Sequence, residues 1–347
     1  MIKNFFLIAV RNISRRKGFT FINVTGLSVG LAASLLILLW VQDEFSYEKF
    51  NLNAKNIYRV EEDQFYSGAR YHVSVTPHPG GPVWREKIPE IKDQTRLNPW
   101  LPRILFQQDD KVFFESSIAA ADSGLMKMFT FPMLMGDPAT VLNSPHSIVL
   151  TEKLARKYFG TSNPVGKTLT LENKYQFTVS GIMKDLPGNS MFTFEGILPY
   201  SFLKEIGATD NSWGDNSIFT FVLLGKDADI KSVDKKLTDI VLENYPQTTT
   251  KFSLFPLTDI HLHGQFGFKE SNGPVIVVYI FTLIAIFILL IACINFINLA
   301  TAKASSRGKE IGIKKVAGAD QMTMIVQFMF ESLLLVAIAM AIALILV

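Results

Sequence analysis

The sequence predicts a membrane protein in which transmembrane α-helices carry a large α+β domain outside the cytoplasm, inserted between the first and second helices. Three apolar runs are each long enough to span a bilayer, which takes about 20 residues in helical form. A long region of mixed polarity, residues 42–273, separates the first run from the second. Basic residues precede the first run and follow the second, so the positive-inside rule places both flanks in the cytoplasm. The region between them therefore lies on the opposite side of the membrane.

The composition limits the classes of protein to which the chain can belong. With 347 residues, 48% of them hydrophobic, the chain lies between an ordinary soluble protein and a polytopic membrane protein. The formal charge of +3 is too small to suggest a nucleic-acid partner, and no basic stripe interleaved with aromatic residues occurs outside the membrane flanks. We therefore expect no nucleic acid to bind. The single cysteine, Cys293, excludes a disulfide within the chain.

The N-terminal part predicts a cytoplasmic segment followed by the first transmembrane helix. Residues 1–18 contain basic side chains and no acidic one, which fixes the N-terminus in the cytoplasm. Apolar residues recur there at helical spacing, which fits either an amphipathic helix on the inner membrane surface or an extension of the first span. Residues 19–41 form that span. The run is too long and begins too late for a cleaved signal peptide.

Residues 42–273 predict an α+β domain. Thr151 is a candidate N-cap for an amphipathic helix that ends at Gly160. After it, apolar and polar residues alternate with the period of two that is typical of a half-buried strand. The further predicted elements are strands at 167–171 and 175–182 with a turn at Asn173, a helix over 230–241, and a strand over 252–257.

Residues 274–299 predict the second transmembrane helix and residues 325–347 the third. The loop between them, residues 300–324, contains five lysine or arginine residues against Glu310 and Asp320, so it should face the cytoplasm.

The same loop has an amphipathic pattern. Ile311, Ile313 and Val316 are interspersed with charged residues at helical spacing, and Gly318 suits the end of a short helix. A membrane anchor needs only the positive charge, whereas a helix that docks on a protein partner uses apolar residues to fill a groove and charges to set orientation. The pattern favours a docking helix.

Several segments in chain order carry a family resemblance. In the outer region they are FSYEKF, NIYRVEE, SIVLTEKLARKYFG, NPVGKTLTL, VSGIMKDLPGNS and LTDIHL; around the loop they are Asn295 and Asn298, the segment KEIGIKKVAGA, and Gln327, Phe328 and Glu331. Together these segments resemble the MacB/FtsX-like permeases of ABC transporters. The resemblance implies a MacB-like periplasmic core domain and an FtsX-like membrane domain, in a multi-pass protein of the cell inner membrane.

The resemblance also implies a function. It makes the chain a permease component that couples ATP hydrolysis by a partner ATPase to a periplasmic conformational change, for export or extraction of a substrate. The coupling residues that it implies are Arg307, Lys309, Glu310, Ile311, Gly312, Ile313, Lys314, Lys315, Val316 and Gly318. We expect no enzyme activity, catalytic residue, cofactor or metal in the chain itself. An alternative of another class is a membrane sensor, or a regulator of periplasmic cell-wall hydrolases.

The implied partners are a cytoplasmic ABC ATPase subunit, membrane lipid, and a second permease copy or permease half. A periplasmic adaptor or an outer-membrane protein is a further candidate. Relatives of this type have a fourth membrane helix, whereas this sequence stops inside its third apolar run. We therefore expect the natural product to continue beyond Val347.

Two short patterns suggest enzyme chemistry but fit structure better. Residues 160–168, GTSNPVGKT, resemble a phosphate-binding P-loop but have five residues instead of four before the Gly-Lys-Thr, and they follow a predicted helix instead of a strand. Gly26-Leu27-Ser28-Val29-Gly30 matches the pattern of a nucleophile elbow but lies within a predicted membrane helix. Because Gly26 and Gly30 are four residues apart, they lie on one helix face and predict close packing of a neighbouring helix.

His261 and His263 are the remaining candidates for chemistry. On a strand, their spacing would place both imidazoles on one face, where they could hold a metal with a third ligand such as His72 or His78. No acidic or cysteine ligand lies at a suitable spacing nearby, so the sequence does not favour a metal site.

Overall fold

The computed structural model describes residues 2–15, 17–66, 68–264, 273–305, 308, 312–313, 316–318 and 320–347. The chain forms two compact units, a membrane unit of Met1–Phe45 and Ile276–Val347 and an outer domain of Ser46–Val275. The predicted fold class is confirmed, because in the described part of the chain three long apolar helices accompany one large domain with a mixed sheet.

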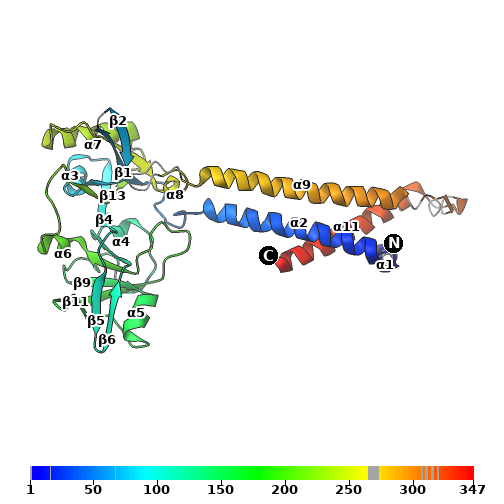
Figure 1. Ribbon diagram of the computed structural model, residues 1–347, viewed down its shortest axis with the longest axis horizontal. Helices are drawn as coiled ribbons and strands as arrows, with labels where there is room; N and C mark the ends of the chain where they lie inside the picture. The colour runs from blue at the N-terminus through cyan, green and yellow to red at the C-terminus, as the bar shows by residue number, and fades with distance from the viewer. Residues whose placement is uncertain are drawn as a thin grey trace. The chain divides into compact units, whose positions relative to one another are not determined.

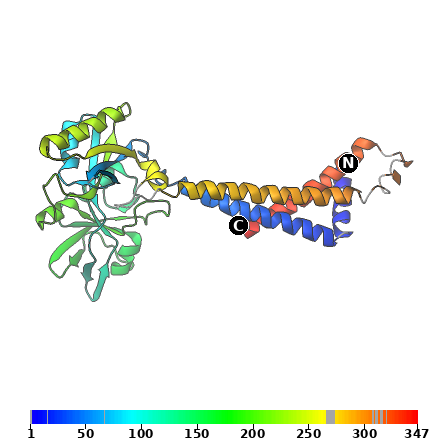
Figure 2. The same cartoon turned by 45° about the horizontal axis from the view of Figure 1, so that its top comes forward.

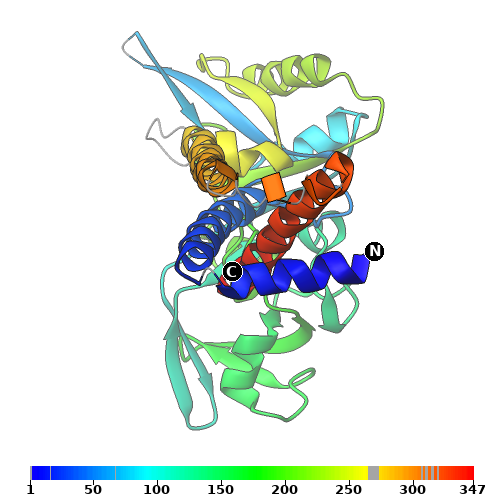
Figure 3. The ribbon, with the colours of Figure 1, turned by 90° about the vertical axis from the view of Figure 1, so that its right-hand side faces the viewer.

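The membrane unit contains four described helices of appreciable length. They are α1 (Ile2–Arg15), α2 (Lys17–Glu44), α9 (Val275–Ser305) and α11 (Gln321–Leu346). Each of α2, α9 and α11 is long and apolar enough to cross a bilayer. Figures 1 and 2 show α2 running alongside α9. In Figure 3 α1 lies across the direction of α2, so α1 is a helix of its own and not an extension of the first span.

One apolar cluster joins the three long helices. Its buried members are Val24 and Leu27 of α2, Ala292 of α9, and Leu335 and Ala339 of α11. Lipid tails are as apolar as leucine, so burial from water contributes little to this association, and close packing of small and medium side chains holds the helices together instead.

In the described part of the outer domain, fourteen strands form one continuous sheet. The strands are β1 (Ile57–Tyr66), β2 (Ala69–Val73), β3 (Thr76–Pro77), β4 (Ile91–Asn98), β5 (Ile104–Gln108), β6 (Lys111–Glu115), β7 (Ile118–Ala121), β8 (Met133–Met135), β9 (Ser147–Thr151), β10 (Thr168–Leu171), β11 (Tyr175–Met183), β12 (Gly196–Pro199), β13 (Asn216–Leu224) and β14 (Lys251–Pro256). Their spatial order is β14-β1-β13-β4-β7-β12-β9-β11-β10-β5-β6, with β2 beside β1, β3 beside β13, and β8 beside β11. Most pairs are antiparallel; β11 with β9 and β12 with β7 are parallel.

Among the described residues of the outer domain, helices and three apolar cores cover the sheet. The helices are α3 (Gly80–Lys87), α4 (Leu125–Met128), α5 (Glu152–Phe159), α6 (Tyr200–Glu205), α7 (Ile230–Asn244), the 3₁₀ turn η1 (Leu257–Asp259) and α8 (Ile260–His263). One core lies under α3 and α7, and a second core packs against α5 and α6. A third core, which is rich in phenylalanine, lies between these two along the spatial order of the strands. This division gives the domain two halves that share one sheet, as Figure 1 shows.

Several local predictions are confirmed. The Thr151 hydroxyl accepts the Leu154 N–H at 3.3 Å and begins α5, and Gly160 ends that helix with a φ of +63°. Glu172 and Asn173 both have positive φ, which is the turn geometry that matches the twist of the β10–β11 hairpin. One local prediction is wrong at its end: the strand β14 stops at Pro256, and Leu257 belongs to the 3₁₀ turn.

Candidate functional site

Most of the predicted docking segment lies outside the described residues. This applies to Arg307, Lys309, Glu310, Ile311, Lys314 and Lys315. Among the described ones, Gly312, Ile313 and Val316 are helical, and the side chains of Ile313 and Val316 are 71% and 91% exposed. The Ala317 N–H donates to the Ile313 carbonyl at 3.0 Å, and Gly318 has a φ of +84°, as is common just after a helix.

The predicted packing residues lie on the face of α2 that meets α9. A Cβ added to Gly30 would stand 2.5 Å from the Ala292 Cβ, and one added to Gly26 would stand 3.3 Å from the Asn295 amide nitrogen. One turn beyond Gly30, the Ser34 hydroxyl donates to the Ala285 carbonyl at 3.1 Å. Small residues at each of these positions let the two backbones approach closely.

The close contact at Gly30 leads to a prediction. Gly30→Leu should weaken the packing of α2 on α9, because the new side chain overlaps the Ala292 methyl group, and overpacking of this kind costs about 1–3 kcal/mol. The thermal unfolding midpoint of the full chain in detergent should fall. Gly18→Leu is the matched control, since nothing lies within 4 Å of a Cβ at Gly18. An equal midpoint for both variants would contradict the prediction.

A buried carboxylate links α1 to the membrane helices. Glu331 of α11 is buried, and the Asn12 side-chain amide of α1 donates to its Oε2 at 3.4 Å. Glu331 also lines a cavity of about 430 Å³ together with Phe19, Asn23 and Phe296. Polar side chains between membrane helices act as specific contacts, because lipid offers them no alternative hydrogen-bond partners.

The outer domain has a site that the sequence did not reveal, which we call the junction. It joins the segment after α2 (Ser46–Asn51), the loop at Asn189–Met191, and α8. The Asn189 side-chain amide donates to the Ser46 hydroxyl at 2.8 Å, and the Glu48 N–H donates to the Asn189 carbonyl at 3.0 Å. The first two segments overlap FSYEKF and VSGIMKDLPGNS, so residues far apart in the chain meet here.

Glu48 is the centre of the junction. Its side chain is buried, and its backbone has a φ of +58°, which is uncommon for a residue other than glycine. Oε1 accepts the Ser190 hydroxyl at 3.0 Å and the Met191 N–H at 2.6 Å, and Oε2 accepts the Asn51 amide at 2.6 Å. Burial raises the pKa of Glu48, while these hydrogen bonds act in the opposite direction. Such a carboxylate fixes the loop at Ser190 and Met191 to the segment Ser46–Asn51.

An aromatic contact closes the junction. The rings of Tyr47 and His261 stack with their centroids 3.4 Å apart and their planes 3° from parallel. Tyr47 lies just after α2, and His261 lies on α8, in the last described part of the outer domain before residue 273. The contact therefore joins the segment by which the chain enters the outer domain to α8, which lies near the end of that domain.

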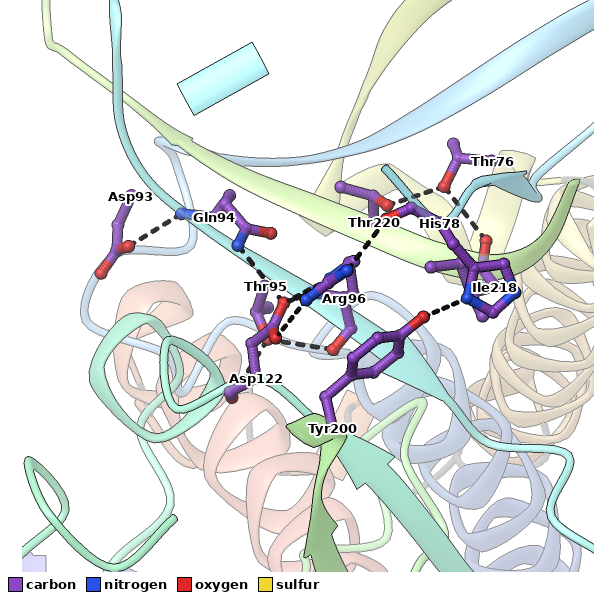
Figure 4. A network of polar contacts seen from close by, with 10 residues as sticks. All are labelled: Thr76, His78, Asp93, Gln94, Thr95, Arg96, Asp122, Tyr200, Ile218 and Thr220. Atoms are coloured by element: carbon purple, nitrogen blue, oxygen red, sulfur yellow. Dashed lines mark hydrogen bonds and ion pairs between the residues drawn. The ribbon is translucent and has the colours of Figure 1, made fainter. Parts of the chain in front are cut away.

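A second polar network ties the two halves of the outer domain together (Figure 4). Arg96 of β4 makes a two-point contact with Asp122, Nε to Oδ2 at 2.8 Å and Nη2 to Oδ1 at 2.9 Å, and its guanidinium lies 3.9 Å from the centroid of the Tyr200 ring. The Tyr200 hydroxyl bonds His78 Nδ1, and His78 Nε2 lies 2.9 Å from the Ser217 hydroxyl. Burial lowers the pKa of His78. Because Nδ1 contacts a phenol and not a carboxylate, the serine–histidine contact lacks the order of a hydrolase triad.

Neither the P-loop-like stretch nor the histidine pair has the geometry that its proposed chemistry would need. The stretch 160–168 follows helix α5 and leads into strand β10, the reverse of P-loop order, and Lys167 Nζ donates to the Ser162 hydroxyl at 2.7 Å. His261 and His263 lie on the single turn α8 and not on a strand, so residues two apart point to different sides. No group of three metal-ligating side chains occurs among the residues that the structure describes.

With this geometry in place, comparison with known proteins gives two family matches. A family model of the MacB-like periplasmic core domain matches residues 20–240, and one of the FtsX-like permease C-terminal region matches residues 282–347. The chain belongs to the MacB/FtsX-like permease family. This MacB/FtsX-like permease is therefore a multi-pass protein of the inner membrane with a large periplasmic domain.

Individual relatives agree with this family. The MacB/FtsX-like permease is 26% identical over 196 residues to the macrolide export ATP-binding/permease protein MacB of Aggregatibacter actinomycetemcomitans, covering 54% of this chain and 28% of that protein. It is 26% identical over 192 residues to the uncharacterized ABC transporter permease YknZ of Bacillus subtilis, covering 55% and 45%. The chain thus spans less than half the length of both relatives.

A solved structure supports the fold of the outer domain. A domain assigned to a permease from Porphyromonas gingivalis aligns with a TM-score of 0.51 at 20% identity, and covers 59% of this chain and 91% of that one. At this identity the likeness concerns the fold alone.

Proposed function

We propose that this permease is the membrane subunit of an ATP-driven ABC transporter, and that it passes the work of a separate cytoplasmic ATPase to its periplasmic domain for export or extraction of a substrate. The observation that carries the proposal is the exposure of Ile313 and Val316 in a basic cytoplasmic loop. Exposing two large aliphatic side chains to water is energetically unfavourable. A loop that only anchors the protein by its positive charge has no need of them. A groove on a partner protein would bury both.

The loop is well placed to act on the membrane helices. Asp320 caps α11, accepting the Thr323 N–H at 3.2 Å, so the loop continues directly into that helix. In turn α11 packs on α2 through Leu335 and Ala339. A displacement of the loop would therefore move α11 as a rigid rod, and α2 with it.

The junction supplies the other end of this route. The chain passes from the end of α2 at Glu44 into the outer domain within a few residues. There Ser46 accepts a hydrogen bond from Asn189, and Glu48 accepts one from the Met191 N–H. A flexible linker would absorb a movement of α2. A segment held by buried hydrogen bonds would instead transmit that movement to the outer domain. The junction thus fits a mechanical role and needs no catalytic group.

The chemistry of the loop and of the membrane helices indicates which partners the permease needs. The loop requires an ATPase with an apolar groove and acidic rim, and membrane lipid surrounds α2, α9 and α11. A second permease copy or half would complete the membrane part, and a periplasmic adaptor or outer-membrane protein is a further candidate partner. The permease itself needs no cofactor for this role.

Replacement of one loop residue tests the proposal. Ile313→Asp should prevent the ATPase from co-purifying with the full chain, and should abolish stimulation of its ATP hydrolysis, because a carboxylate replaces an apolar anchor in the groove. An anchor of this kind typically contributes about 2 kcal/mol or more to binding, a loss of roughly thirtyfold in affinity.

The control keeps the charge change and leaves the aliphatic residues in place. Gly308→Asp adds the same charge to an exposed position of the same loop, so it should reduce ATPase recovery far less. Glu310→Lys should lower it through orientation of the docked helix. Recovery and stimulation at parental levels in an Ile313→Asp/Val316→Asp double variant would rule out this segment as the ATPase contact.

A further inference from the structure

Strand β6 forms a free edge of the outer-domain sheet and presents apolar residues there. Within the described residues β6 pairs only with β5, at one end of the strand order. Val112, Phe113 and Phe114 are consecutive, and their side chains are 46%, 43% and 56% exposed. Proteins normally protect such edges with charged residues or proline, because unpaired backbone groups beside apolar side chains form a template for another strand. The β5–β6 hairpin extends from the sheet as Figure 1 shows.

The register of the hairpin shows which backbone groups lie on the free edge. Asp109 and Asp110 form a two-residue turn, and Gln108 and Lys111 are the pair that closes it. In an antiparallel ladder, residues of one strand alternate between bonding the neighbour on one side and facing the other side. The backbone groups of Lys111 form hydrogen bonds with β5. The N–H and carbonyl groups of Val112 and Phe114 therefore point away from β5, toward the free edge.

The sequence of β6 is complementary to itself when two copies run antiparallel. In a register centred on Phe113, Phe113 lies opposite its own copy, Val112 opposite Phe114, and Lys111 opposite Glu115. The outward backbone groups of Val112 and Phe114 then satisfy each other on both strands. Opposite charges face each other at both ends, and shifting the register by one residue to either side loses this match.

The charged ends of β6 are held in position by helix α5. Lys111 Nζ donates to the carbonyls of Lys157 at 3.1 Å and Tyr158 at 2.7 Å. Glu115 accepts Lys157 Nζ at 2.6 Å and is largely buried. On the opposite face of the strand the Arg103 guanidinium lies 5.2 Å from the centroid of the Phe114 ring. The edge is therefore preorganised, with Lys111 fixed at one end and Glu115, which is paired with Lys157, fixed at the other.

We propose that β6 pairs with β6 of a second copy of this chain, antiparallel and centred on Phe113, and so joins the outer-domain sheets of two permeases. A two-fold axis generates this antiparallel arrangement, because an isologous contact places the same strand on both sides. The Lys-Val-Phe-Phe-Glu order favours a second copy over an unrelated strand, since it is its own complement. The second copy belongs to the proposed function, but this surface does not depend on the ATPase.

Cysteine crosslinking in the membrane tests the pairing. In the full chain with Cys293→Ala, Phe113→Cys should form an intermolecular disulfide under mild oxidation, because the two residues on the axis are a non-hydrogen-bonded pair with Cα atoms about 4.5 Å apart. Asp109→Cys is the matched control on the same hairpin. In this register its two copies would be more than roughly 25 Å apart and should not crosslink.

A second substitution prevents pairing at the free edge of β6 and leaves the hairpin folded. Val112→Pro deletes an N–H that faces outward and leaves the β5 ladder intact, so it should abolish the Phe113→Cys crosslink while protease resistance of the outer domain is kept. The proposal is overturned if Phe113→Cys does not crosslink above the Asp109→Cys level, if its crosslink survives Val112→Pro, or if it joins a different protein. Because no ATPase enters the assay, failure here is distinct from failure of the loop proposal.

Discussion

Replacing Glu48 by Ala is expected to destabilise the outer domain by about 3–5 kcal/mol. The substitution leaves the Ser190 hydroxyl, the Met191 N–H and the Asn51 amide without their acceptor, and each buried donor that loses its partner costs about 1–3 kcal/mol. Urea unfolding of the full chain in detergent, followed by the fluorescence of Trp84, Trp100 and Trp213, should show an earlier transition.

A surface glutamate provides the control for this loss. Glu86→Ala removes an exposed carboxylate of α3 and should change the free energy of unfolding by less than about 0.5 kcal/mol. If Glu48→Ala unfolds at the same urea concentration as Glu86→Ala, the Glu48 carboxylate does not hold the junction together. In that event the proposed transmission of movement through the junction would lose its support.

The junction also shows where prediction from the sequence stops. Hydrophobic length and flanking charge predicted α2, α9 and α11, and local signals such as the Thr151 cap and the turn at Asn173 predicted α5 and the β10–β11 hairpin. Those signals act over a few residues. The contact of Glu48 with Ser190 spans 142 positions, and no periodicity records it. The segments FSYEKF and VSGIMKDLPGNS can be recognised in the sequence, but only the fold brings them together.

The sheet order escaped prediction for the same reason. Strand β1 lies between β14 and β13, both from the far end of the domain, and such pairings depend on tertiary packing instead of local propensity. His261 shows how a wrong local assumption misleads. On a strand it would have shared a face with His263 as a potential ligand pair, whereas on α8 it stacks on Tyr47.

Glu62 of β1 should make the stability of the outer domain depend on pH. Glu62 is fully buried, it accepts the Gln64 side-chain amide, and burial raises its pKa to about 8. The folded state therefore keeps a proton that the unfolded chain releases near its ordinary pKa of 4.5. Where the folded state binds more protons, stability falls as pH rises. The domain should thus lose stability between about pH 4.5 and pH 8, by an amount on the order of 3–5 kcal/mol.

Glu62→Gln removes this titration while it keeps the shape of the side chain and the acceptor for Gln64. At pH 4 we expect the variant to match the parent, and at pH 8 to exceed it by most of that free energy. A smaller decline should remain in the variant above about pH 6.5, because Glu61 and Asp63 raise the pKa of His72, so its stabilising charge is lost as pH rises through the folded-state pKa. Urea unfolding at a series of pH values measures both slopes, and Glu86→Gln should follow the parent. If the Glu62→Gln curve runs parallel to the parent's from pH 4 to pH 8, then Glu62 is ionised in the folded domain, and its burial is compensated by contacts other than that with Gln64.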